Sequence, residues 1–346
     1  MKLLLLFFCF ICFVTLPATA QLEANNWLWG PGRAVQFLPS LREIEEDSFH
    51  FTTEGVVSIS DHSTGNTLFY SDNTSSNRYQ YNIFNQNHER ISIPPLRGDG
   101  SSAQGLLSVP DPANCHRYYL FSLDQRGVET HYNTKTRLSY SILDMSDGIG
   151  QIISRDNLVI EDFLTEGMTG TIHSNGYDFW VIVYRFKESS FVSIPITDQG
   201  VMTANIVFSP APDIAYPPFI GHYLNYLKIS PNSKKLLCSW YQKLSLLDVN
   251  NTTGEISNSI LLEGFSYTFT FSPDNTKIFY IKNFRNKLSD QIGTLYQIDL
   301  NDFQLSAKAI DTVNSIWYQF SSSMQIAPDG KIYFISSPKN GNSPIW

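Results

Sequence analysis

The sequence predicts an all-β fold, namely a WD40/YVTN-like β-propeller of six four-stranded antiparallel blades. A strand–turn–strand unit recurs along the chain, which is typical of repeat architectures. No segment of ten or more residues shows helical periodicity. The chain of 346 residues is 42% hydrophobic, 14% aromatic and only 16% charged, so it is too apolar to be disordered.

The repeated unit is clearest in three segments, residues 226–237, 269–280 and 324–334. Each has an alternating strand, then Ser or Ala, Pro, and Asp or Asn, and then Lys before a second apolar strand. Proline fixes φ at the second turn position, and Asp or Asn can bond its own nearby backbone. Such a corner joins two antiparallel neighbours.

Three looser copies precede these. The six predicted corners are anchored by Asp61, Asp111, Asn175, Asn232, Asp274 and Asp329, at intervals of 50, 64, 57, 42 and 55 residues. A blade of four strands needs about 40–50 residues, so these are blades with some longer loops. Further strands are expected between the corners, at residues 138–144, 151–154, 244–249, 255–257, 295–300 and 303–305.

Ring closure needs strands from both ends of the chain. The last blade shows two strands before Trp346, and residues 27–29 and 34–38 supply two spare strands. We expect these to complete the last blade and remove its open edges. This gives six blades in one domain over residues 21–346, with a seventh if the chain is a fragment truncated at its C-terminus.

The first 20 residues have the pattern of an export signal. Lys2 precedes a 12-residue apolar stretch, and Ala18-Thr19-Ala20 is a small-x-small cleavage site. We expect cleavage after Ala20 and a mature start near Gln21. A retained anchor is the alternative, although the stretch is short for a membrane span.

Cys115 and Cys238 are the cysteines outside this leader. They lie 123 residues apart, so the sequence does not say whether they meet. We expect two buried free thiols, with a disulfide as the alternative.

A family resemblance rests on motifs in a fixed order. They include Asn25-Asn26-Trp27, residues 54–61, 65–72 and 81–85, Ser102-Ala103-Gln104-Gly105, residues 118–121 and 140–145, His173-Ser174-Asn175-Gly176, and residues 191–201. In that order they resemble the N-terminal propeller-like module of large exported Bacteroidetes proteins, which use type IX secretion and are often labelled gliding-motility-associated. The resemblance implies a surface or secreted module and supplies no catalytic residues.

No catalytic signature is present. The sequence has no Gly-x-Ser-x-Gly, His-Glu-x-x-His, Walker or dinucleotide-binding pattern. We therefore predict no catalytic residues, no metal site and no cofactor, and the ligand-binding residues are unknown at this stage.

Several weaker patterns are better explained by ordinary structural roles than by function. A ring could gather histidines into one channel, but we expect the seven to be ordinary surface or strand residues: His50, His62, His88, His116, His131, His173 and His222. Residues 248–255 approximate a calcium loop but fit a simple hairpin better. Arg97-Gly98-Asp99 is expected in an ordinary polar loop, as are the acidic residues Glu43, Glu45, Glu46, Asp47, Glu161 and Asp162.

Aromatic residues on strands are expected to pack between blades, because propeller sheets bury both faces. These are Trp180, Trp240, Phe269, Phe271, Tyr280, Tyr333 and Phe334. Loop aromatics are better ligand candidates, namely Tyr216, Trp317 and Tyr318.

The functional expectation is an exported, non-enzymatic binding or structural propeller that presents loops to a protein or glycan, outside the cell or on its surface. Its formal net charge of −8 argues against nucleic acid, and we expect no membrane span in the mature chain, which would be a monomer or a module of a larger protein. One alternative is a propeller glycoside hydrolase or lyase with residues converging at the channel mouth. Another is a periplasmic partner-binding propeller similar to the Tol-system component with Ser-Pro-Asp-Gly repeats.

Overall fold

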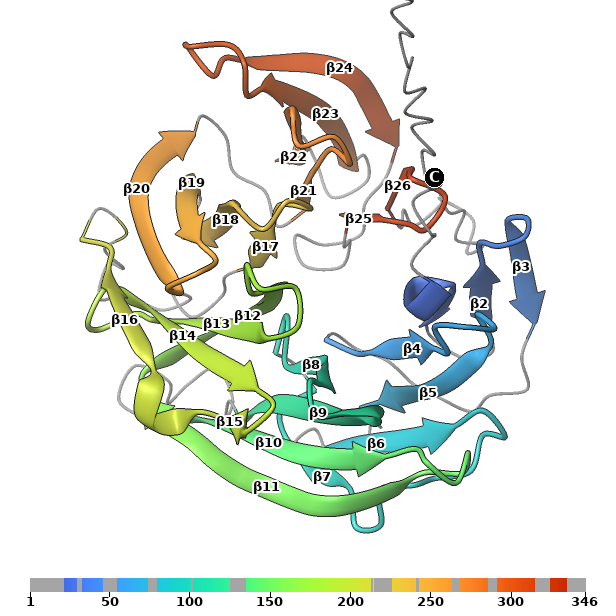
Figure 1. The fold of residues 1–346 in the computed structure, drawn as a ribbon. Helices are drawn as coiled ribbons and strands as arrows, with labels where there is room; N and C mark the ends of the chain where they lie inside the picture. Colours follow the sequence, from blue (N-terminus) through green and yellow to red (C-terminus); the bar gives the residue numbers. More distant parts are fainter. Residues whose placement is uncertain are drawn as a thin grey trace, which may run out of the picture.

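The computed structural model describes most of the chain between residues 22 and 334 (Figure 1). The described residues are 22–29, 33–45, 55–73, 80–100, 102–124, 135–212, 214, 226–240, 243–262, 268–285, 291–314 and 324–334. The predicted leader, residues 1–20, lies outside them. None of the helices within these ranges is long and apolar enough to cross a membrane.

All six predicted corners are confirmed. In each, the Asp or Asn side chain accepts a hydrogen bond from the backbone N–H two residues on, for example Ser63 N to Asp61 Oδ1 at 3.0 Å and Lys331 N to Asp329 Oδ1 at 3.0 Å. The others form the same bond at Asp111, Asn175, Asn232 and Asp274. Each corner joins the innermost strand of a sheet to its second strand, so the corners occupy equivalent places around the ring.

Within the described ranges, five sheets have four or more strands (Figure 1). Blade one has β4 (Ser58–Ser60), β5 (Thr67–Asp72), β6 (Gln80–Asn85) and β7 (Leu96–Arg97), and blade two has β8 (Leu106–Asp111), β9 (Asn114–Asp124), β10 (Thr136–Asp144) and β11 (Gln151–Asp162). Blade three has β12 (Leu164–Ile172), β13 (Phe179–Arg185), β14 (Ser190–Thr197), β15 (Gly200–Val201) and β16 (Val207–Pro210). Blade four has β17 (Leu227–Ile229), β18 (Lys235–Trp240), β19 (Lys243–Asn250) and β20 (Glu255–Leu262), and blade five has β21 (Phe269–Phe271), β22 (Lys277–Arg285), β23 (Gln291–Asp299) and β24 (Ala307–Asn314).

The sixth corner belongs to blade six, described as β25 (Met324–Ile326) and β26 (Ile332–Phe334). The N-terminal strands β1 (Asn26–Trp29), β2 (Arg33–Gln36) and β3 (Arg42–Glu45) lie between blade six and blade one. They close the ring, but the prediction that they complete the last blade is wrong for the described strands. In the described part of the chain they form a sheet of their own and share no ladder with β25–β26. The two sheets meet through side chains, with Tyr333 in edge contact with the rings of Trp27 and Phe37 at 6.2 and 5.1 Å.

The core is a closed series of apolar clusters, one at each contact between neighbouring sheets. The cluster between blades three and four, for instance, contains Trp180 of β13 and Trp240 of β18. The strand aromatics pack between blades as predicted: Trp180, Trp240, Phe269, Phe271, Tyr280 and Tyr333 are buried, and Phe334 is partly buried against Ile281 and Met324. Each sheet therefore relies on both neighbours to cover its two faces.

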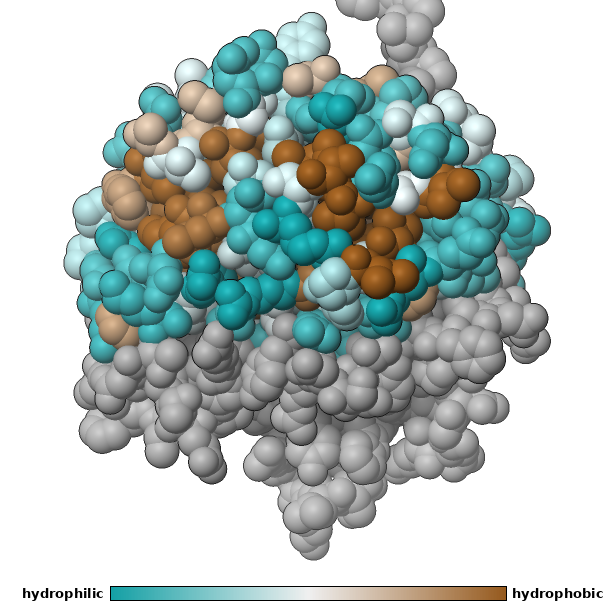
Figure 2. All heavy atoms as spheres, turned by 90° about the horizontal axis from the view of Figure 1, so that it is seen from below, coloured by the Kyte–Doolittle hydropathy of each residue, from teal (hydrophilic) through white to brown (hydrophobic). Residues whose placement is uncertain are grey.

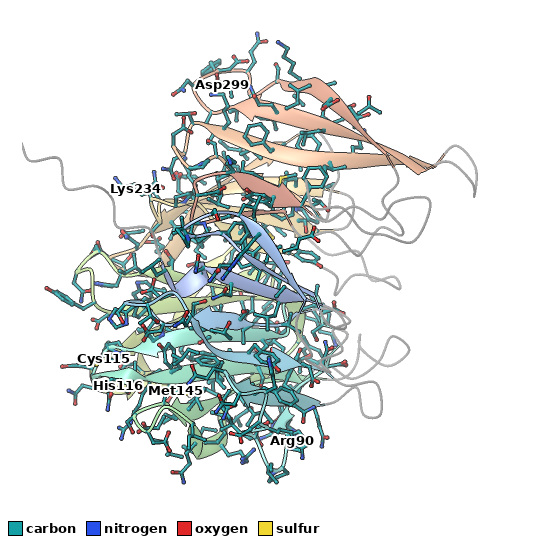
Figure 3. All side chains as sticks on the ribbon, turned by 90° about the vertical axis from the view of Figure 1, so that its right-hand side faces the viewer. Arg90, Cys115, His116, Met145, Lys234 and Asp299 are labelled. Carbon is teal, nitrogen blue, oxygen red and sulfur yellow. The ribbon has the colours of Figure 1, made fainter. Side chains whose placement is uncertain are left out.

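The ring has two distinct faces. Cys115, His116, Met145 and Lys234, which lie in or beside turns, are found along one side in the view of Figure 3. This is the corner face. Because the strands are antiparallel, the C-terminal ends of β5, β9 and β11 and the start of β12 lie on the opposite face. The short 3-10 helix η1 (Leu22–Ala24) precedes β1, and η3 (Thr203–Asn205) separates β15 from β16.

Two expectations about local structure are wrong. Residues 303–305 lie in a turn, and β24 starts only at Ala307, because Asp302 accepts hydrogen bonds from Gln304 and Leu305 through its side chain and carbonyl. Cys115 is exposed rather than buried, because it lies at the hairpin between β8 and β9. Cys238 is a buried free thiol as expected, and the two cysteines form no disulfide.

Gly254 shows how tightly blades three and four fit together. It has φ of +76°, and a Cβ added there would lie 2.7 Å from the Trp180 ring. Gly176 has a similar φ of +80°, but a Cβ added there would meet nothing within 4 Å. We expect Gly176→Ala to lower the free energy of unfolding by about 1–2 kcal/mol through backbone strain. Gly254→Ala should cost about 2 kcal/mol more, because the methyl group also displaces the indole. Urea unfolding followed by tryptophan fluorescence measures both, and equal losses would contradict this contact.

Candidate functional site

Residues 102–105 lie at the inner edge of the ring, which we call the hub. They precede β8 of blade two and reach the innermost strands of the next two blades. Ala103 N donates to Glu166 Oε2 at 3.0 Å, and Gln104 N donates to Glu166 O at 3.2 Å, so the segment is bound to β12 of blade three. We call residues 102–105 the crossbar.

Gln104 extends the crossbar to blade four. Its Nε2 donates to Leu227 O at 2.9 Å, and its Oε1 accepts from Leu227 N at 2.7 Å. Leu227 belongs to β17, an innermost strand that pairs on one side only, with β18. The carboxamide therefore pairs with both backbone groups of Leu227, as a neighbouring strand would.

The crossbar has little room to move. A Cβ added at Gly105 would lie 2.2 Å from the Tyr81 hydroxyl, and one added at Gly55 would lie 2.4 Å from Gly105 N. The Tyr81 hydroxyl donates to Asp99 O at 2.8 Å. Glycines at these places let strands and crossbar approach closely.

Buried carboxylates surround the crossbar on this side of the ring. Asp72, Asp99, Asp124 and Glu166 are each less than 10% exposed. Asn82 Nδ2 donates to Asp72 Oδ1 at 2.7 Å, and Arg97 Nε lies 3.0 Å from Asp124 Oδ2. A buried charge is costly unless it is paired, and here the partners come from the scaffold. These contacts supply partners to buried carboxylates at the hub.

Lys228 is the hub's unpaired cation. It follows Leu227 on β17, so its side chain points to the other face of the sheet, toward blade five. Among the described residues it has no ion-pair or hydrogen-bond partner. Burial lowers its pKa from 10.5 to about 8, although the side chain keeps partial exposure. The site therefore holds an amine that loses its proton more easily than a surface lysine does.

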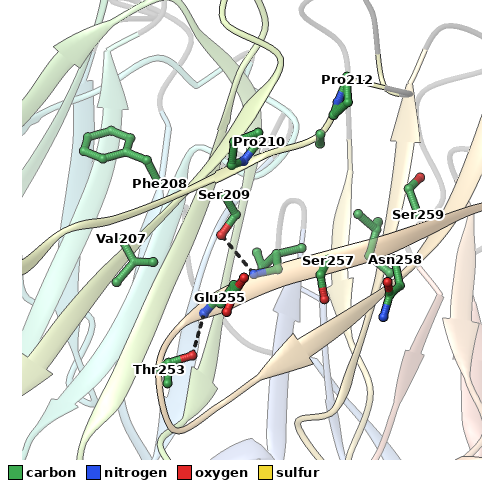
Figure 4. A pocket seen from close by; sticks show the side chains of 13 residues that line it. Val207, Phe208, Ser209, Pro210, Pro212, Thr253, Glu255, Ser257, Asn258 and Ser259 are labelled. Carbon is green, nitrogen blue, oxygen red and sulfur yellow. Dashed lines mark hydrogen bonds between the residues drawn. The ribbon is translucent and has the colours of Figure 1, made fainter.

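A groove of about 540 Å³ lies at the outer rim, between blades three and four (Figure 4). Its walls are β16 with the residues that follow it and the first half of β20 with the preceding turn. Thirteen residues line it: Val207, Phe208, Ser209, Pro210, Ala211, Pro212, Leu247, Thr253, Glu255, Ile256, Ser257, Asn258 and Ser259.

A hydrogen bond between described residues joins the two walls in the middle of the groove. Ile256 N donates to the buried hydroxyl of Ser209 at 2.9 Å (Figure 4). Beside it, the Glu255 carboxylate and the Ser257 hydroxyl are exposed and have no partner among the described residues. Asn258 is already occupied, since its Nδ2 donates to Asp248 Oδ2 at 2.8 Å. The groove thus offers one unpaired carboxylate and an unused hydroxyl.

The outer surface also carries apolar side chains. On β11, the outermost strand of blade two, Ile153 and Leu158 are 44% and 47% exposed. Figure 2 shows this side of the ring, with apolar patches separated by polar groups. The β10–β11 ladder is interrupted near Asp156, which has φ of +50°. Such a bulge limits edge-to-edge pairing.

The structure tests several candidates from the sequence. Arg97-Gly98-Asp99 is not an ordinary polar loop: Asp99 is buried, and a Cβ at Gly98 would lie 2.3 Å from the Tyr81 ring. Residues 248–255 form a hairpin, as preferred, in which Asp248 pairs with Lys235 at 2.5 Å. His173 lies in a corner and bonds Thr252 O at 2.9 Å. No cluster of metal-ligating side chains is found in the part of the chain that the structure describes.

The expectation of a polar loop is wrong for four of the acidic residues: Glu43 and Glu45 lie on β3, and Glu161 and Asp162 lie at the end of β11. Asp162 is paired with Arg185 at 3.0 Å, whereas Glu161 is exposed, with Arg137 Nε 3.9 Å away. Glu43 is exposed. The remaining candidates lie outside the described residues: Glu46, Asp47, His50, His131, Tyr216, His222, Trp317 and Tyr318.

Sequence reasoning missed the crossbar and the groove. Residues 102–105 were noted only as part of a family resemblance, and Gln104 meets a strand 123 residues away, which leaves no local signal. For the groove, Pro210 and Pro212 close to β16 were the available sign of an atypical outer strand.

Comparisons with known proteins support the fold. No family model matches the chain, and no curated protein matches it. Among solved structures, the Cps50 (Swd1) β-propeller domain of Myceliophteria thermophila is similar over 94% of this chain and 95% of its own, with 8% identity and a TM-score of 0.50. TolB from Acinetobacter baumannii covers 77% of this chain and 72% of its own, at 13% identity and a TM-score of 0.35. The match to Kuenenia stuttgartiensis hydrazine synthase covers 67% of this chain, at 16% identity and a TM-score of 0.38. This chain spans only 56% of the length of that hydrazine synthase chain. The likeness to the Cps50 (Swd1) domain shows a propeller fold and nothing finer.

Removing the Gln104 side chain should destabilise the hub. Gln104→Ala leaves Leu227 N–H and C=O without the partners described above, and unmet buried groups cost about 1–3 kcal/mol each. We expect a loss of roughly 2–4 kcal/mol in urea unfolding and faster hydrogen exchange of the Leu227 amide. Gln199→Ala, at an exposed turn, is the control and should change stability by less than about 0.5 kcal/mol. Unchanged exchange at Leu227 would show that the amide clamp is dispensable.

Lys228 should make stability depend on pH in the alkaline range. Its folded-state pKa of about 8 lies below the 10.5 of the unfolded chain, so the unfolded state binds the proton more tightly. Below pH 8 the buried lysine is charged in the folded state, so burial lowers the free energy of unfolding by its full amount. As the pH rises from 8 toward 10.5, the folded state loses this proton first, and the free energy of unfolding rises. We expect Lys228→Met to be more stable than the wild type at pH 7 and to lack this rise. Thermal unfolding from pH 7 to 10 measures it, with exposed Lys308→Met as the control that should parallel the wild type.

Proposed function

We propose that the chain is an exported, non-enzymatic β-propeller that binds a protein or a glycan, in the extracellular space or on the cell surface. The observation that carries this proposal is the contrast between hub and rim. Apart from Lys228, the hub groups described above bond the crossbar and the strands around it, whereas the rim groove keeps polar groups available for a ligand.

Export is inferred from the N-terminal leader pattern, and the surface location from the resemblance to Bacteroidetes modules that use type IX secretion. The fold agrees with both but is neutral between them, because propellers host many functions. A periplasmic binding propeller similar to the Tol-system component is the competing location. Fractionation of the host cell, with an antibody to the mature chain, separates the two: retention in the periplasm would contradict the surface proposal.

The non-enzymatic part is tested by turnover assays. We expect the purified chain from Gln21 onward to bind a host protein or an arrayed glycan and to leave a panel of polysaccharides intact. The enzymatic alternative predicts reproducible hydrolysis or lyase activity that disappears in Glu166→Gln or Asp99→Asn. Such a loss, in variants that keep wild-type circular dichroism, would overturn the proposal. Loss of activity with loss of structure would be resolved by repeating the assay with the milder Asp72→Asn.

A further inference from the structure

We propose that the rim groove between β16 and β20 binds a short, extended segment of a protein that carries a basic side chain. This inference rests on the proposed binding function and names the partner class of the groove. It is argued from the orientation of the β20 edge, the unpaired carboxylate and the covered aromatic ring.

The β20 edge favours an extended peptide. Ile256 N points away from β19, since it donates to Ser209 Oγ in the opposite wall. In an antiparallel strand the N–H and C=O of one residue point to the same side, so the Ile256 carbonyl also faces the groove. Because the Ile256 N–H is taken by Ser209, a peptide strand would pair with this edge through the Ile256 carbonyl. The opposite wall competes little, because Pro210 and Pro212 have no backbone N–H.

The charge of the groove selects a basic partner. Glu255 is exposed and has no ion pair among the described residues, while the nearby Asp248 already pairs with Lys235. The formal net charge of −8 would steer a cationic segment toward the chain and disfavour a second copy of it. A Lys or Arg beside Glu255, with Ser257 available to the peptide backbone, would fix the register of the bound segment.

A glycan fits the lining less well. Phe208 is the aromatic residue of the lining, and the Arg185 guanidinium lies over its ring, 4.6 Å from the centroid. Arg185 is in turn held by Asp162 at 3.0 Å. Phe208 is 49% exposed, but one face of its ring is covered by a fixed side chain, so only the other face is open to a sugar ring.

The test uses a phage-displayed library of random 12-residue peptides selected on the immobilised full chain, followed by fluorescence polarisation with the enriched peptides. We expect enriched peptides to share a Lys or Arg within an alternating, extended pattern. Glu255→Lys should weaken their binding about five- to tenfold, because an attraction is replaced by a repulsion. Asp311→Lys makes the same charge change on β24, another outermost strand, and should change binding less than about twofold.

Other outcomes would overturn the inference. These are the absence of enriched peptides, enriched peptides that bind Glu255→Lys as tightly as the wild type, or glycan-array binding that is lost in Glu255→Lys. Dimerisation of the wild type by light scattering that is lost in this variant would identify a second copy instead. Unchanged near-ultraviolet circular dichroism must accompany both variants; if Glu255→Lys does not fold, Glu255→Gln with a smaller expected loss replaces it. Peptides that bind elsewhere would refute this groove and leave the proposed binding function standing, whereas no binding of any protein or glycan would refute both.

Discussion

Ring closure is the constraint on which the structure depends. A sheet that is apolar on both faces is stable only with a neighbour on each side, and the clusters between neighbouring sheets form an unbroken circle. The seam shows how this constraint is met with strands from distant parts of the chain. β1–β3 and β25–β26 share no ladder within the described residues, yet Val35, Phe37 and Tyr333 join them through buried side chains. Closure here depends on apolar burial and ring–ring contact rather than on a continuous sheet.

Closing the ring still leaves unpaired backbone N–H and C=O groups at the edges of each sheet. Each blade has an innermost edge at the hub and an outermost edge at the rim. At the hub, Gln104 satisfies β17 by pairing with the N–H and C=O of Leu227. At the rim, irregular ladders in β11 and β24 break the edge, with Asp156 at positive φ, whereas β20 stays regular from Glu255 to Ser257 and is interrupted at Asn258, which has positive φ. The innermost edge is thus satisfied by a side chain that pairs with it, whereas the outermost edges are protected by irregularities in their ladders.

The sequence allowed the fold to be predicted because its decisive signals are local. A corner needs only Pro and Asp or Asn within three residues, and the Asp274 corner formed where that pattern stands. The burial of Phe269 and Phe271 followed from strand alternation in the same way. The strand expected at 303–305 failed because Asp302 makes its own turn, which apolar alternation does not register. The burial of Cys115 was wrongly predicted because its aromatic neighbours suggested the interior of a strand. Cys115 is instead the second residue of β9, next to the hairpin turn, and is exposed.

The sites were harder to predict because they arise from contacts between distant blades. Gln104 and Leu227 are ordinary residues until the ring brings them together, and the same is true of Ser209 and Ile256. In blade three the outermost strand is divided into β15, η3 and β16, and β14 pairs with both strands. That division, with the two prolines at the end of β16, keeps β16 from lying flat against β20 and leaves the groove between them. A propeller can therefore keep its packed ring and still gain a groove at the rim, because a change in one outer strand alters the rim without disturbing the packing that closes the ring.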